Sequence, residues 1–489
     1  MRYDAAIIGA GANGLAAAAA LAGAGLKTIV IERANACGGR AITREFHRGF
    51  RASAYCDEIA PIPADIFRAL DLARHGAILV PVASSLALWR ERQHESLKWT
   101  RCESWQRLTD AARDRMSHMQ ARVSADTLGR PERRWWRPAP DVAPWPGEDW
   151  SNLSLAELLG ESMSADTCAH AMAATLGGRS ADPFLNGSAL HLLTPTGGGA
   201  FMGGLATLAG ALTASARAAG AEISLGLEAG EVCLSGGRAA GVRLADGTGI
   251  AARAVISTLD LRRTFFSLFA WKDLPQATAQ RVSAYRFGGG TARLLLALDG
   301  LTFLGRDLQQ GPIHIAPGLG ASASAHALWS DSIMPEHPPI TLRCVSAADP
   351  GLAPPGKSVM TATIGCIPHH LFDGAWTNEK RSLLRERVLD AIEDVMPGTK
   401  GRILAADLIL PPDIEDALGV TEGDLDGGEI APDQMFAHRG FANCKGGRTP
   451  IGGLYLGGAS SPAGVLGTCA AGIAAARAVM SDLTAGGLR

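Results

Sequence analysis

The chain has 489 residues, of which 47% are hydrophobic, and a formal net charge of only −2. A chain of this length can bury a sizeable core and divide into about two or three domains. The near-neutral balance argues against nucleic acid as a partner, because nucleic-acid-binding domains carry strongly basic surfaces. The nine cysteines form no CxxC pair and no metal-ligand spacing. This argues against a disulfide reductase and a metal site, and favours reduced thiols in a cytoplasmic protein.

The stretch AAIIGAGANGLAAAAALAGAGLKTIVIERANACGGRAIT, residues 5 to 43, could be a secretory signal, an alanine-rich core segment or a phosphate-binding turn. A secretory signal needs a cationic head before its apolar run. Here Asp4 neutralises Arg2, and glycines interrupt a run that is rich in alanine rather than leucine. The segment is therefore expected to belong to the folded protein.

The apolar spacing predicts a strand over 3–8, a helix over 15–24 and a second strand over 28–31. In such a unit Gly9 permits a tight turn, Gly11 lets the backbone approach a pyrophosphate, and Gly14 lets the helix pack closely on the strand. Glu32 ends the second strand, where a carboxylate accepts hydrogen bonds from an adenosine ribose and repels a 2′-phosphate. The pattern predicts a dinucleotide site that disfavours NADP.

The residues that follow distinguish NAD from FAD. Arg33 comes directly after Glu32, and a second glycine pair with an arginine follows at Gly38-Gly39-Arg40. A longer cofactor needs another charge-assisted donor for its pyrophosphate, which an arginine supplies. This arrangement favours FAD, whereas a surface turn with a solvated arginine is the alternative.

The stretch from Gly9 to Thr43 resembles the start of the FAD-containing amine oxidase and phytoene desaturase superfamily. The closing GGRTPIGGLYLGGASSPAGVLGTCAAGIAAARA, residues 446 to 477, resembles the terminal segment with which that family surrounds the flavin. Intermediate segments occur in the family's order, at 194–225, 237–265, 349–376 and 422–436. The nearest branch is similar to the phytoene desaturase-like proteins that include the pyridine nucleotide-disulfide oxidoreductase domain proteins.

The resemblance implies an α/β fold, with a Rossmann-like FAD-binding domain of the GR2-type flavoproteins and an interleaved α+β substrate domain. The FAD-binding domain would take residues 1–80, 191–260 and 440–489. The substrate domain would take residues 81–190 and 261–439. No internal repeat and no long low-complexity linker interrupts this division.

Cofactor-binding residues follow from the fingerprint and from the resemblance. In related flavoproteins the residue that corresponds to Ala229 contributes backbone contacts to the adenine, and the helix that begins after residue 464 stabilises negative charge at the flavin N1 and C2 oxygen. The expected set is Gly9, Gly11, Asn13, Gly14, Glu32, Arg33, Gly39, Arg40, Ala41, Ala229, Gly457, Gly458, Gly464, Val465, Leu466 and Gly467.

Two departures from the family pattern concern the substrate. Related carotenoid desaturases carry Thr-His-Pro-Gly-Gly-Gly where this chain has the shorter stretch Ser460 to Gly464, with serine at the histidine position. Gly427 stands where close relatives often carry histidine. Both changes favour a reshaped, smaller pocket and a compact substrate.

The implied activity is that of an FAD-dependent oxidoreductase, a desaturase, dehydrogenase or oxidase. It would remove two hydrogens from a largely apolar or cyclic small molecule by hydride transfer to flavin N5. Oxygen or a quinone would accept the electrons. A flavin-dependent isomerase, an amine oxidase and a non-catalytic flavoprotein that binds a partner are alternatives.

Proton-handling candidates are His191 and Tyr55, ahead of His369, His370 and His438. His191 precedes a Thr-Pro-Thr-Gly-Gly turn that the family places near the flavin. A structural, hydrogen-bonded role is the alternative for each of them.

The segment 130–150 combines four tryptophans with five prolines, a composition that resists regular helix or strand. It could be a lid over an apolar cleft, a peripheral membrane contact of a cytoplasmic protein, or a structural loop. The tryptophans are Trp135, Trp136, Trp145 and Trp150.

Overall fold

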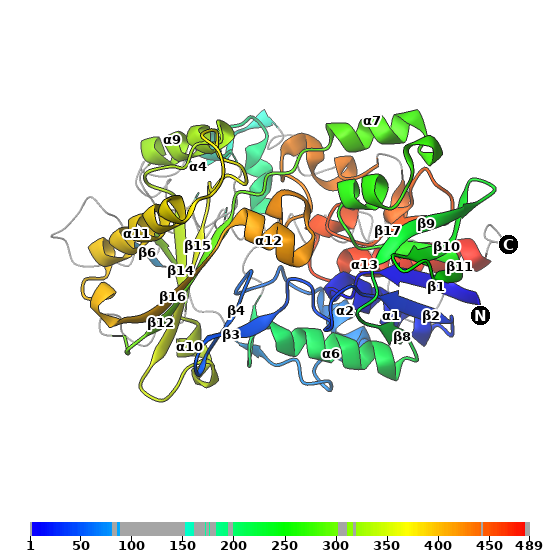
Figure 1. Ribbon diagram of the computed structural model, residues 1–489, viewed down its shortest axis with the longest axis horizontal. Helices are drawn as coiled ribbons and strands as arrows, with labels where there is room; N and C mark the ends of the chain where they lie inside the picture. The colour runs from blue at the N-terminus through cyan, green and yellow to red at the C-terminus, as the bar shows by residue number, and fades with distance from the viewer. Residues whose placement is uncertain are drawn as a thin grey trace.

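The computed structural model describes residues 2–80, 86–88, 152–160, 172, 176, 182–193, 199–301, 311–315, 319–441 and 444–484. Two large sheets, of seven and six strands, lie toward opposite ends of the molecule (Figure 1). The four tryptophans of segment 130–150, and with them the hypotheses of a lid or a membrane contact, lie outside the described residues.

The first sheet has the strand order β8-β2-β1-β11-β10-β9, with β17 beside β11. Its strands β8, β2, β1, β11 and β17 run parallel, and β10 and β9 form an antiparallel extension. The strands are β1 (Arg2–Ile8), β2 (Thr28–Ile31), β8 (Glu222–Ser224), β9 (Ala229–Ser235), β10 (Arg238–Leu244), β11 (Gly249–Ser257) and β17 (Leu454–Leu456).

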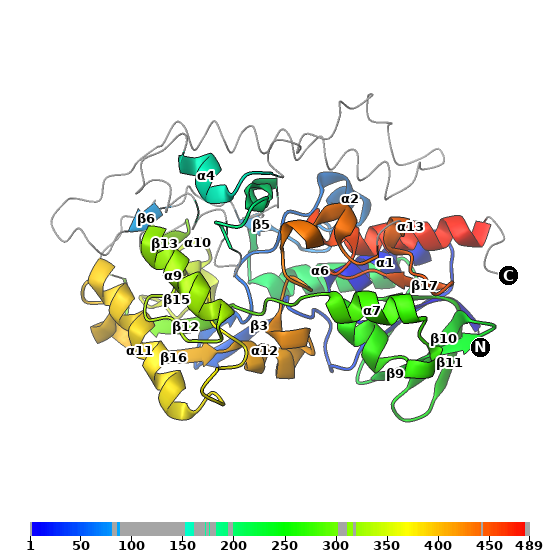
Figure 2. The ribbon, with the colours of Figure 1, turned by 90° about the horizontal axis from the view of Figure 1, so that it is seen from above.

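Successive residues of β1 point into two different cores, as the two-residue period of a strand requires. Ala5 and Ile7 join the core with helices α1 (Ala12–Gly23), α6 (Leu205–Ala218) and α13 (Ala470–Thr484). Ala6 and Ile8 join the opposite core, to which Val282 of α7 (Gln276–Ala284) contributes. Figure 2 shows α1 and α13 on one side of this sheet and α7 on the other. We call this sheet with its helices the first lobe.

Small residues let the helices of the first lobe approach closely. Five of the twelve residues of α1 are buried alanines. A Cβ added to Gly472 of α13 would lie 1.9 Å from the carbonyl oxygen of Asn13 in α1. The N-terminal and C-terminal helices therefore pack backbone against backbone.

The second sheet has the order β16-β12-β15-β14-β13-β6. All seven residues of its strand β12 are buried. Leu294, Leu296 and Leu298 pack on α11 (Asn378–Val395), which covers the outer face. We call this sheet with α11 the second lobe. The strands are β6 (Leu86–Leu88), β12 (Ala292–Leu298), β13 (Ile313–Ile315), β14 (Ile340–Arg343), β15 (Ser358–Ile364) and β16 (Ile403–Ile409).

The inner face of the second sheet looks toward the first lobe. Leu295 and Ala297 of β12 pack there against Phe50 and Ala52 of the hairpin β3–β4. That hairpin and α12 lie between the two sheets (Figure 1). The remaining elements named below are α2 (Ala64–Ala69), β3 (Thr43–His47), β4 (Phe50–Ser53), β5 (Leu79–Val80), α4 (Leu155–Gly160), η2 (Ser188–Leu193), β7 (Ala200–Phe201), α9 (Leu319–Ser330), α10 (Val345–Ala348), η5 (Pro350–Leu352), α12 (Pro411–Leu418), η9 (Phe436–His438) and η11 (Pro462–Val465).

The first strand–helix–strand unit forms where the sequence predicts it, with small differences in the bounds of β1 and of the helix. Strand β1 extends one residue before the expected 3–8, and β2 coincides with 28–31. The helix begins at Ala12 rather than at residue 15, because Gly11 already supplies the extended residue before it, with φ −74° and ψ 178°. Among the helices of the described residues, none is long and apolar enough to cross a membrane.

Candidate functional site

In the turn between β1 and α1, two glycines are tightly packed against neighbouring atoms and a third faces open space. A Cβ on Gly9, which has φ +98°, would lie 2.4 Å from Thr258 Oγ1. A Cβ on Gly14 would lie 2.0 Å from the carbonyl oxygen of Gly9. A Cβ on Gly11 would have no described atom within 4 Å. Gly9 and Gly14 are thus required by packing, whereas Gly11 leaves room for a ligand.

The start of α1 provides donors on this open side. Its N-cap residue, Gly11, makes no side-chain cap, and the first turn contains no acidic residue. The first N–H groups of a helix lack intrahelical acceptors and stand at the positive end of its dipole. These features fit the pyrophosphate of a dinucleotide.

Glu32 stands at the end of β2 and is already bonded to the turn. Its Oε2 accepts from the backbone N–H of Ala10 at 2.7 Å, and its Oε1 accepts from that of Ala34 at 2.9 Å. The carbonyl oxygen of Glu32 accepts from the N–H of Leu227 at 2.9 Å, two residues before Ala229 begins β9. The expected ribose-binding and adenine-binding residues therefore lie on neighbouring segments.

The second glycine pair contacts the first turn. Gly38 forms a parallel bridge with Gly11, and a Cβ on Gly39 would lie 3.3 Å from the Cα of Gly11. Ala41 is buried behind this pair. The Arg40 guanidinium donates to the carbonyl oxygen of Leu425 at 2.7 Å.

Arg33 points away from the turn in this structure. Its Nη2 donates to the carbonyl oxygen of Ala417 at 2.9 Å, at the C-terminal end of α12. A cation is favoured at that end of a helix. The contact connects the cofactor side of the first lobe to the segment between the lobes.

The C-terminal segment brings four expected glycines against backbone and side chains. A Cβ added to Gly457 would lie 2.6 Å from Ile256 Cγ2, and one added to Gly458 would lie 2.5 Å from the carbonyl oxygen of Thr258. A Cβ on Gly464 would lie 2.1 Å from the carbonyl oxygen of Ala459, and one on Gly467 would lie 2.4 Å from that of Pro61. Val465 and Leu466, around the end of η11, are buried. Asn13 joins this region through its Oδ1, which accepts from the N–H of Gly472 at 3.3 Å. These positions are set by close chain packing beside the turn.

Three ion pairs connect the inner face of the second sheet to residues 44–58. Each joins one strand of that sheet to the first hairpin or the segment after it. They are Arg44 Nη2 with Asp407 Oδ2 at 2.5 Å, Glu58 Oε1 with Arg343 Nη1 at 2.5 Å, and Asp57 Oδ1 with Arg293 Nη2 at 2.6 Å. The first is substantially exposed, the second is largely buried, and the third is buried, with Arg293 side-chain exposure of 0%.

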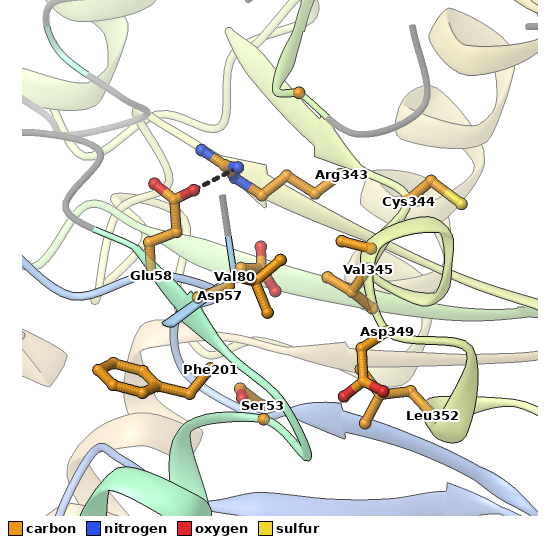
Figure 3. A pocket seen from close by; sticks show the side chains of 14 residues that line it. Ser53, Asp57, Glu58, Val80, Phe201, Arg343, Cys344, Val345, Asp349 and Leu352 are labelled. Carbon is orange, nitrogen blue, oxygen red and sulfur yellow. Dashed lines mark ion pairs between the residues drawn. The ribbon is translucent and has the colours of Figure 1, made fainter. Parts of the chain in front are cut away.

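A cavity that is partly open to solvent lies in this interface. Its wall is formed by β4, β5 and β7 on one side, and by β14 of the second sheet with α10 and η5 on the other. Figure 3 shows Arg343 pointing toward Glu58 at its edge. The lining residues labelled there are Ser53, Asp57, Glu58, Val80, Phe201, Arg343, Cys344, Val345, Asp349 and Leu352.

The acidic groups of the cavity are held in different ways. Burial raises the pKa of the Glu58 carboxyl, and the Arg343 guanidinium opposes this effect. Asp349 Oδ2 accepts from the N–H of Gly203 at 2.5 Å, and its Oδ1 accepts from that of Gly351 at 3.2 Å. The raised pKa of Glu58 makes it a candidate for exchanging a proton.

Tyr55 lies two residues before Asp57 and packs against the core beneath the hairpin. Burial raises the pKa of its hydroxyl, while Arg44 acts in the opposite direction. His191 is 2% exposed within η2 and is absent from the lining of the interface cavity. The two sequence-based candidates are thus not brought together at that cavity.

The other histidine candidates lie elsewhere. His369 Nε2 is 2.7 Å from Glu415 Oε2 of α12, and burial, then His370, lowers the His369 pKa. His438 is exposed at the end of η9, and its carbonyl oxygen accepts from Arg281. Neither residue lines the interface cavity.

A second, smaller cavity lies between residues 288–291 and 423–430. Asp424 in its wall accepts backbone hydrogen bonds from Gly288 at 2.9 Å and Asp426 at 2.8 Å. Burial, followed by repulsion from Asp426, raises its pKa to about 6. Gly427 lies beside Ala459, whose Cβ would be 2.9 Å from an added Cβ. A histidine at position 427 would therefore need the loop to move.

The sequence reasoning missed the residues of the interface ion pairs. Arg293 could have been recognised as a buried charge, because it is a charged residue inside the seven-residue apolar strand ARLLLAL. Asp57 and Glu58 carried a weaker one, as adjacent carboxylates in an otherwise apolar stretch. Their partners could not be identified, because the paired residues are far apart in the chain.

Comparisons with known proteins agree with this architecture. A model of an NAD(P)-binding Rossmann-like domain matches residues 7–71, and the model of flavin-containing amine oxidoreductase matches residues 152–480. Pyridine nucleotide-disulfide oxidoreductase domain-containing protein 2 of Mus musculus is 29% identical over 98% of this chain and 94% of its own length.

Two further similarities are more distant. The lycopene-forming phytoene desaturase of Pseudescherichia vulneris is 26% identical over 54% of this chain and 52% of its own. A structure of putrescine oxidase bound to putrescine has the same fold, with a TM-score of 0.62, 15% identity and 99% of both chains covered. The chain therefore belongs to the flavin-containing amine oxidoreductase family and is an FAD-dependent oxidoreductase.

Proposed function

We propose that the protein dehydrogenates a compact small molecule that binds between the two lobes. The observation that carries this proposal is the interface cavity, whose wall combines apolar and ionisable side chains. Strands β4, β5 and β7 face β14 of the second sheet across that wall, and substrate sites commonly lie where two structural units meet. The open side of Gly11 supports a cofactor in the adjacent first lobe.

Apolar and ionisable residues would have different roles in this cavity. Val80, Phe201 and Leu352 would hold the carbon skeleton and exclude water. When bound, FAD supplies the hydride acceptor for a substrate C–H. The second hydrogen leaves as a proton, so that a C=C or C=N bond forms. Glu58 is the proposed proton acceptor, because burial brings its pKa closer to the working range of a general base.

Oxidation of an amine is the second candidate. Asp57 and Glu58 form ion pairs with Arg293 and Arg343, which leaves Asp349 as the lining carboxylate without an ion pair among the described residues. Its negative charge favours a ligand that carries a positive charge or N–H donors. The putrescine-bound oxidase has the same fold and also supports this candidate.

An anaerobic reduction screen distinguishes these candidates. The yellow holoprotein is mixed, without oxygen, with neutral cyclic ketones, terpenoids, polyenes and amines, and loss of the flavin absorbance is followed. Bleaching by amines alone supports amine oxidation, and bleaching by the neutral compounds supports desaturation. Product formed without flavin reduction would instead indicate an isomerase, and no reaction with any compound would contradict both candidates.

Two variants test which residue takes the proton. Glu58→Gln keeps the size of the side chain and should slow flavin reduction about 10²-fold or more at saturating substrate, the range for a positioned general base. His191→Gln tests the sequence-based hypothesis in the same assay. If flavin reduction is slow in the His191 variant and normal in the Glu58 variant, the general base is His191 of η2 rather than Glu58.

A further inference from the structure

Arg343 is the last residue of β14, and its side chain lines the interface cavity. Ile340 and Leu342 of the same strand pack in the core beneath α11, so the alternation of a strand places Arg343 on the opposite, inner face of the sheet. Figure 3 shows its side chain extending toward Glu58 at the edge of the cavity. The side chain is 17% exposed. A small molecule in the cavity can therefore contact this cation.

The ion pair with Glu58 uses only part of the Arg343 guanidinium. Nη1 lies 2.5 Å from Glu58 Oε1, but the two groups are not aligned as a hydrogen bond, and Oε1 has no hydrogen-bond partner among the described residues. Within the described part of the chain, no residue accepts a hydrogen bond from Nε or Nη2 of Arg343, and neither nitrogen is buried. A guanidinium carries five N–H donors in a fixed fork. The side of the fork formed by Nε and Nη2 is thus available to a ligand.

Arginine–carboxylate pairs away from the cavity are built differently. Arg381 donates to both carboxylate oxygens of Asp413, at 2.8 and 2.7 Å. Arg448 donates to both oxygens of Asp482, at 2.9 Å from Nε and 2.7 Å from Nη2. Two parallel hydrogen bonds of this kind are the strong, structurally specific form of the pair. The Arg343 pair lacks this form, although it lies in the wall of a cavity.

The other carboxylates of the cavity wall do not occupy the open donors of Arg343. Asp57 pairs with Arg293 at 2.6 Å, and Asp349 accepts from the backbone N–H groups of Gly203 and Gly351. A planar guanidinium with a free fork matches the geometry of a carboxylate. The cavity therefore favours a ligand with a carboxylate, and this group and the amine favoured by Asp349 can belong to one molecule.

We propose that Arg343 determines substrate specificity, because its Nε–H and Nη2–H donate to a carboxylate of the substrate in the interface cavity. The inference rests on the proposed function, and it names the substrate class as compact molecules that carry a carboxylate. Glu58 contacts the same guanidinium, so its negative charge competes with the carboxylate of the ligand. This competition distinguishes a ligand-binding role of Arg343 from a role that only holds Glu58 in the wall.

The test measures ligand binding to the holoprotein by isothermal titration calorimetry. The probes are two matched pairs, benzoate with benzamide and propionate with propionamide, whose members differ in charge but hardly in shape. The variants are Arg343→Gln and Glu58→Gln. Arg387→Gln is the control, because Arg387 lies on α11, donates to the carbonyl oxygen of Pro335 and does not line the cavity. Thermal unfolding establishes that each variant is folded.

The two variants should change the affinity for the acids in opposite directions. Arg343→Gln should weaken both acids about 10-fold or more, the loss expected for hydrogen bonds to a charged group, and change the affinity for the amides much less. Glu58→Gln should strengthen both acids by about 3-fold or more, because a competing negative charge is removed. Arg387→Gln should change neither, and the affinity of the apoprotein for FAD should be the same in all variants.

Equal losses for acids and amides in Arg343→Gln, or weaker binding of the acids in Glu58→Gln, would mean that Arg343 only supports the wall, and either result overturns the proposal. A wild-type protein that binds neither acid overturns it as well. A loss of FAD affinity in Arg343→Gln would assign the cation to the cofactor, with the same consequence.

If Arg343→Gln does not fold, the direction of the effect of Glu58→Gln decides alone. Failure of the proposed function has a different signature, because then no compound of the reduction screen would bleach the flavin of the wild-type protein. The calorimetric result does not depend on turnover, so the two failures are distinguishable.

Discussion

The cofactor turn and the lobe interface are built in opposite ways. Apart from its contact with Thr258, the turn depends on glycines and backbone groups that lie close together in the chain, as in the contact of Glu32 with the N–H of Ala10. The interface depends on charged side chains whose partners are 236 residues apart, for Arg293 and Asp57, or 363, for Arg44 and Asp407. A local motif therefore reveals the cofactor site, whereas the substrate side is formed by residues that only the tertiary structure brings together.

The largest expected effect is the loss of stability caused by a side chain at Gly14, in the tightly packed part of the turn. Gly14→Ala places a Cβ 2.0 Å from a backbone oxygen that cannot rotate away, so it should lower the free energy of unfolding by about 3 kcal/mol or more. Chemical denaturation of the apoprotein measures this change. Gly25→Ala probes a glycine with no described atom near its Cβ position, although its φ of +84° adds strain of its own. Equal stability of Gly14→Ala and wild type would show that packing does not close the turn.

The next largest effect is a pH dependence of stability that comes from Asp424, in the wall of the smaller cavity. The pKa of Asp424 is raised to about 6, so its folded form binds a proton that the unfolded chain has already released between about pH 4 and 6. Its contribution to stability is therefore present at low pH and lost as the pH rises through about 6. Relative to Asp424→Asn, the wild type should lose about 2–3 kcal/mol across that window.

Denaturation of both proteins at several pH values measures this difference. Asn cannot accept both backbone hydrogen bonds that Asp424 accepts. This lowers the free energy of unfolding of Asp424→Asn by the same amount at every pH, so it does not change how the difference between the two proteins depends on pH. A stability difference that is independent of pH between 4 and 7 would contradict the raised pKa.

The open side of the turn should respond in binding rather than in folding. Gly11→Ala meets no described atom and should leave the free energy of unfolding of the apoprotein nearly unchanged. The added methyl group should nevertheless weaken FAD about 10- to 100-fold, or about 1.4–2.8 kcal/mol, by crowding the pyrophosphate. Fluorescence titration of the apoprotein with FAD checks this, and unchanged affinity would place the pyrophosphate elsewhere.

The smallest effect is expected at the exposed edge of the interface. The side chains of Arg44 and Asp407 are 45% and 36% exposed, so Arg44→Gln should change stability by less than about 1 kcal/mol. Thermal unfolding at low and at high salt measures it. A loss as large as that of a buried pair would mean that the edge of the interface is as important as its centre.

Local sequence signals account for the part of the fold that was predicted. The apolar runs of β1 and β2, with three glycines and a carboxylate at fixed spacing, specify the first strand–helix–strand unit without reference to the rest of the chain. The second sheet is different, because its strands pair across long separations, with β12 between β15 and β16. No turn residue or period fixes that register.

The same distinction applies within the candidate site. Gly427 was recognised in the sequence as unusual, but its cause, the approach of Ala459, is a contact that only the fold reveals. Asn13 was expected at the cofactor, and in the structure its side chain accepts from the N–H of Gly472. The interface cavity draws on Val80, Phe201, Arg343 and Leu352, which share no motif.

The close packing of α1 on α13 has a consequence for how the protein is made. The turn that should receive the cofactor leaves the ribosome well before α13, whose Gly472 contacts Asn13 across a separation of 459 residues. Contacts between such distant segments form late, because a long loop must close before they are gained. Until then the early turn exposes alanine surface that α13 would cover. Cofactor loading should thus be post-translational, and a nascent chain arrested before α13 should emerge without FAD.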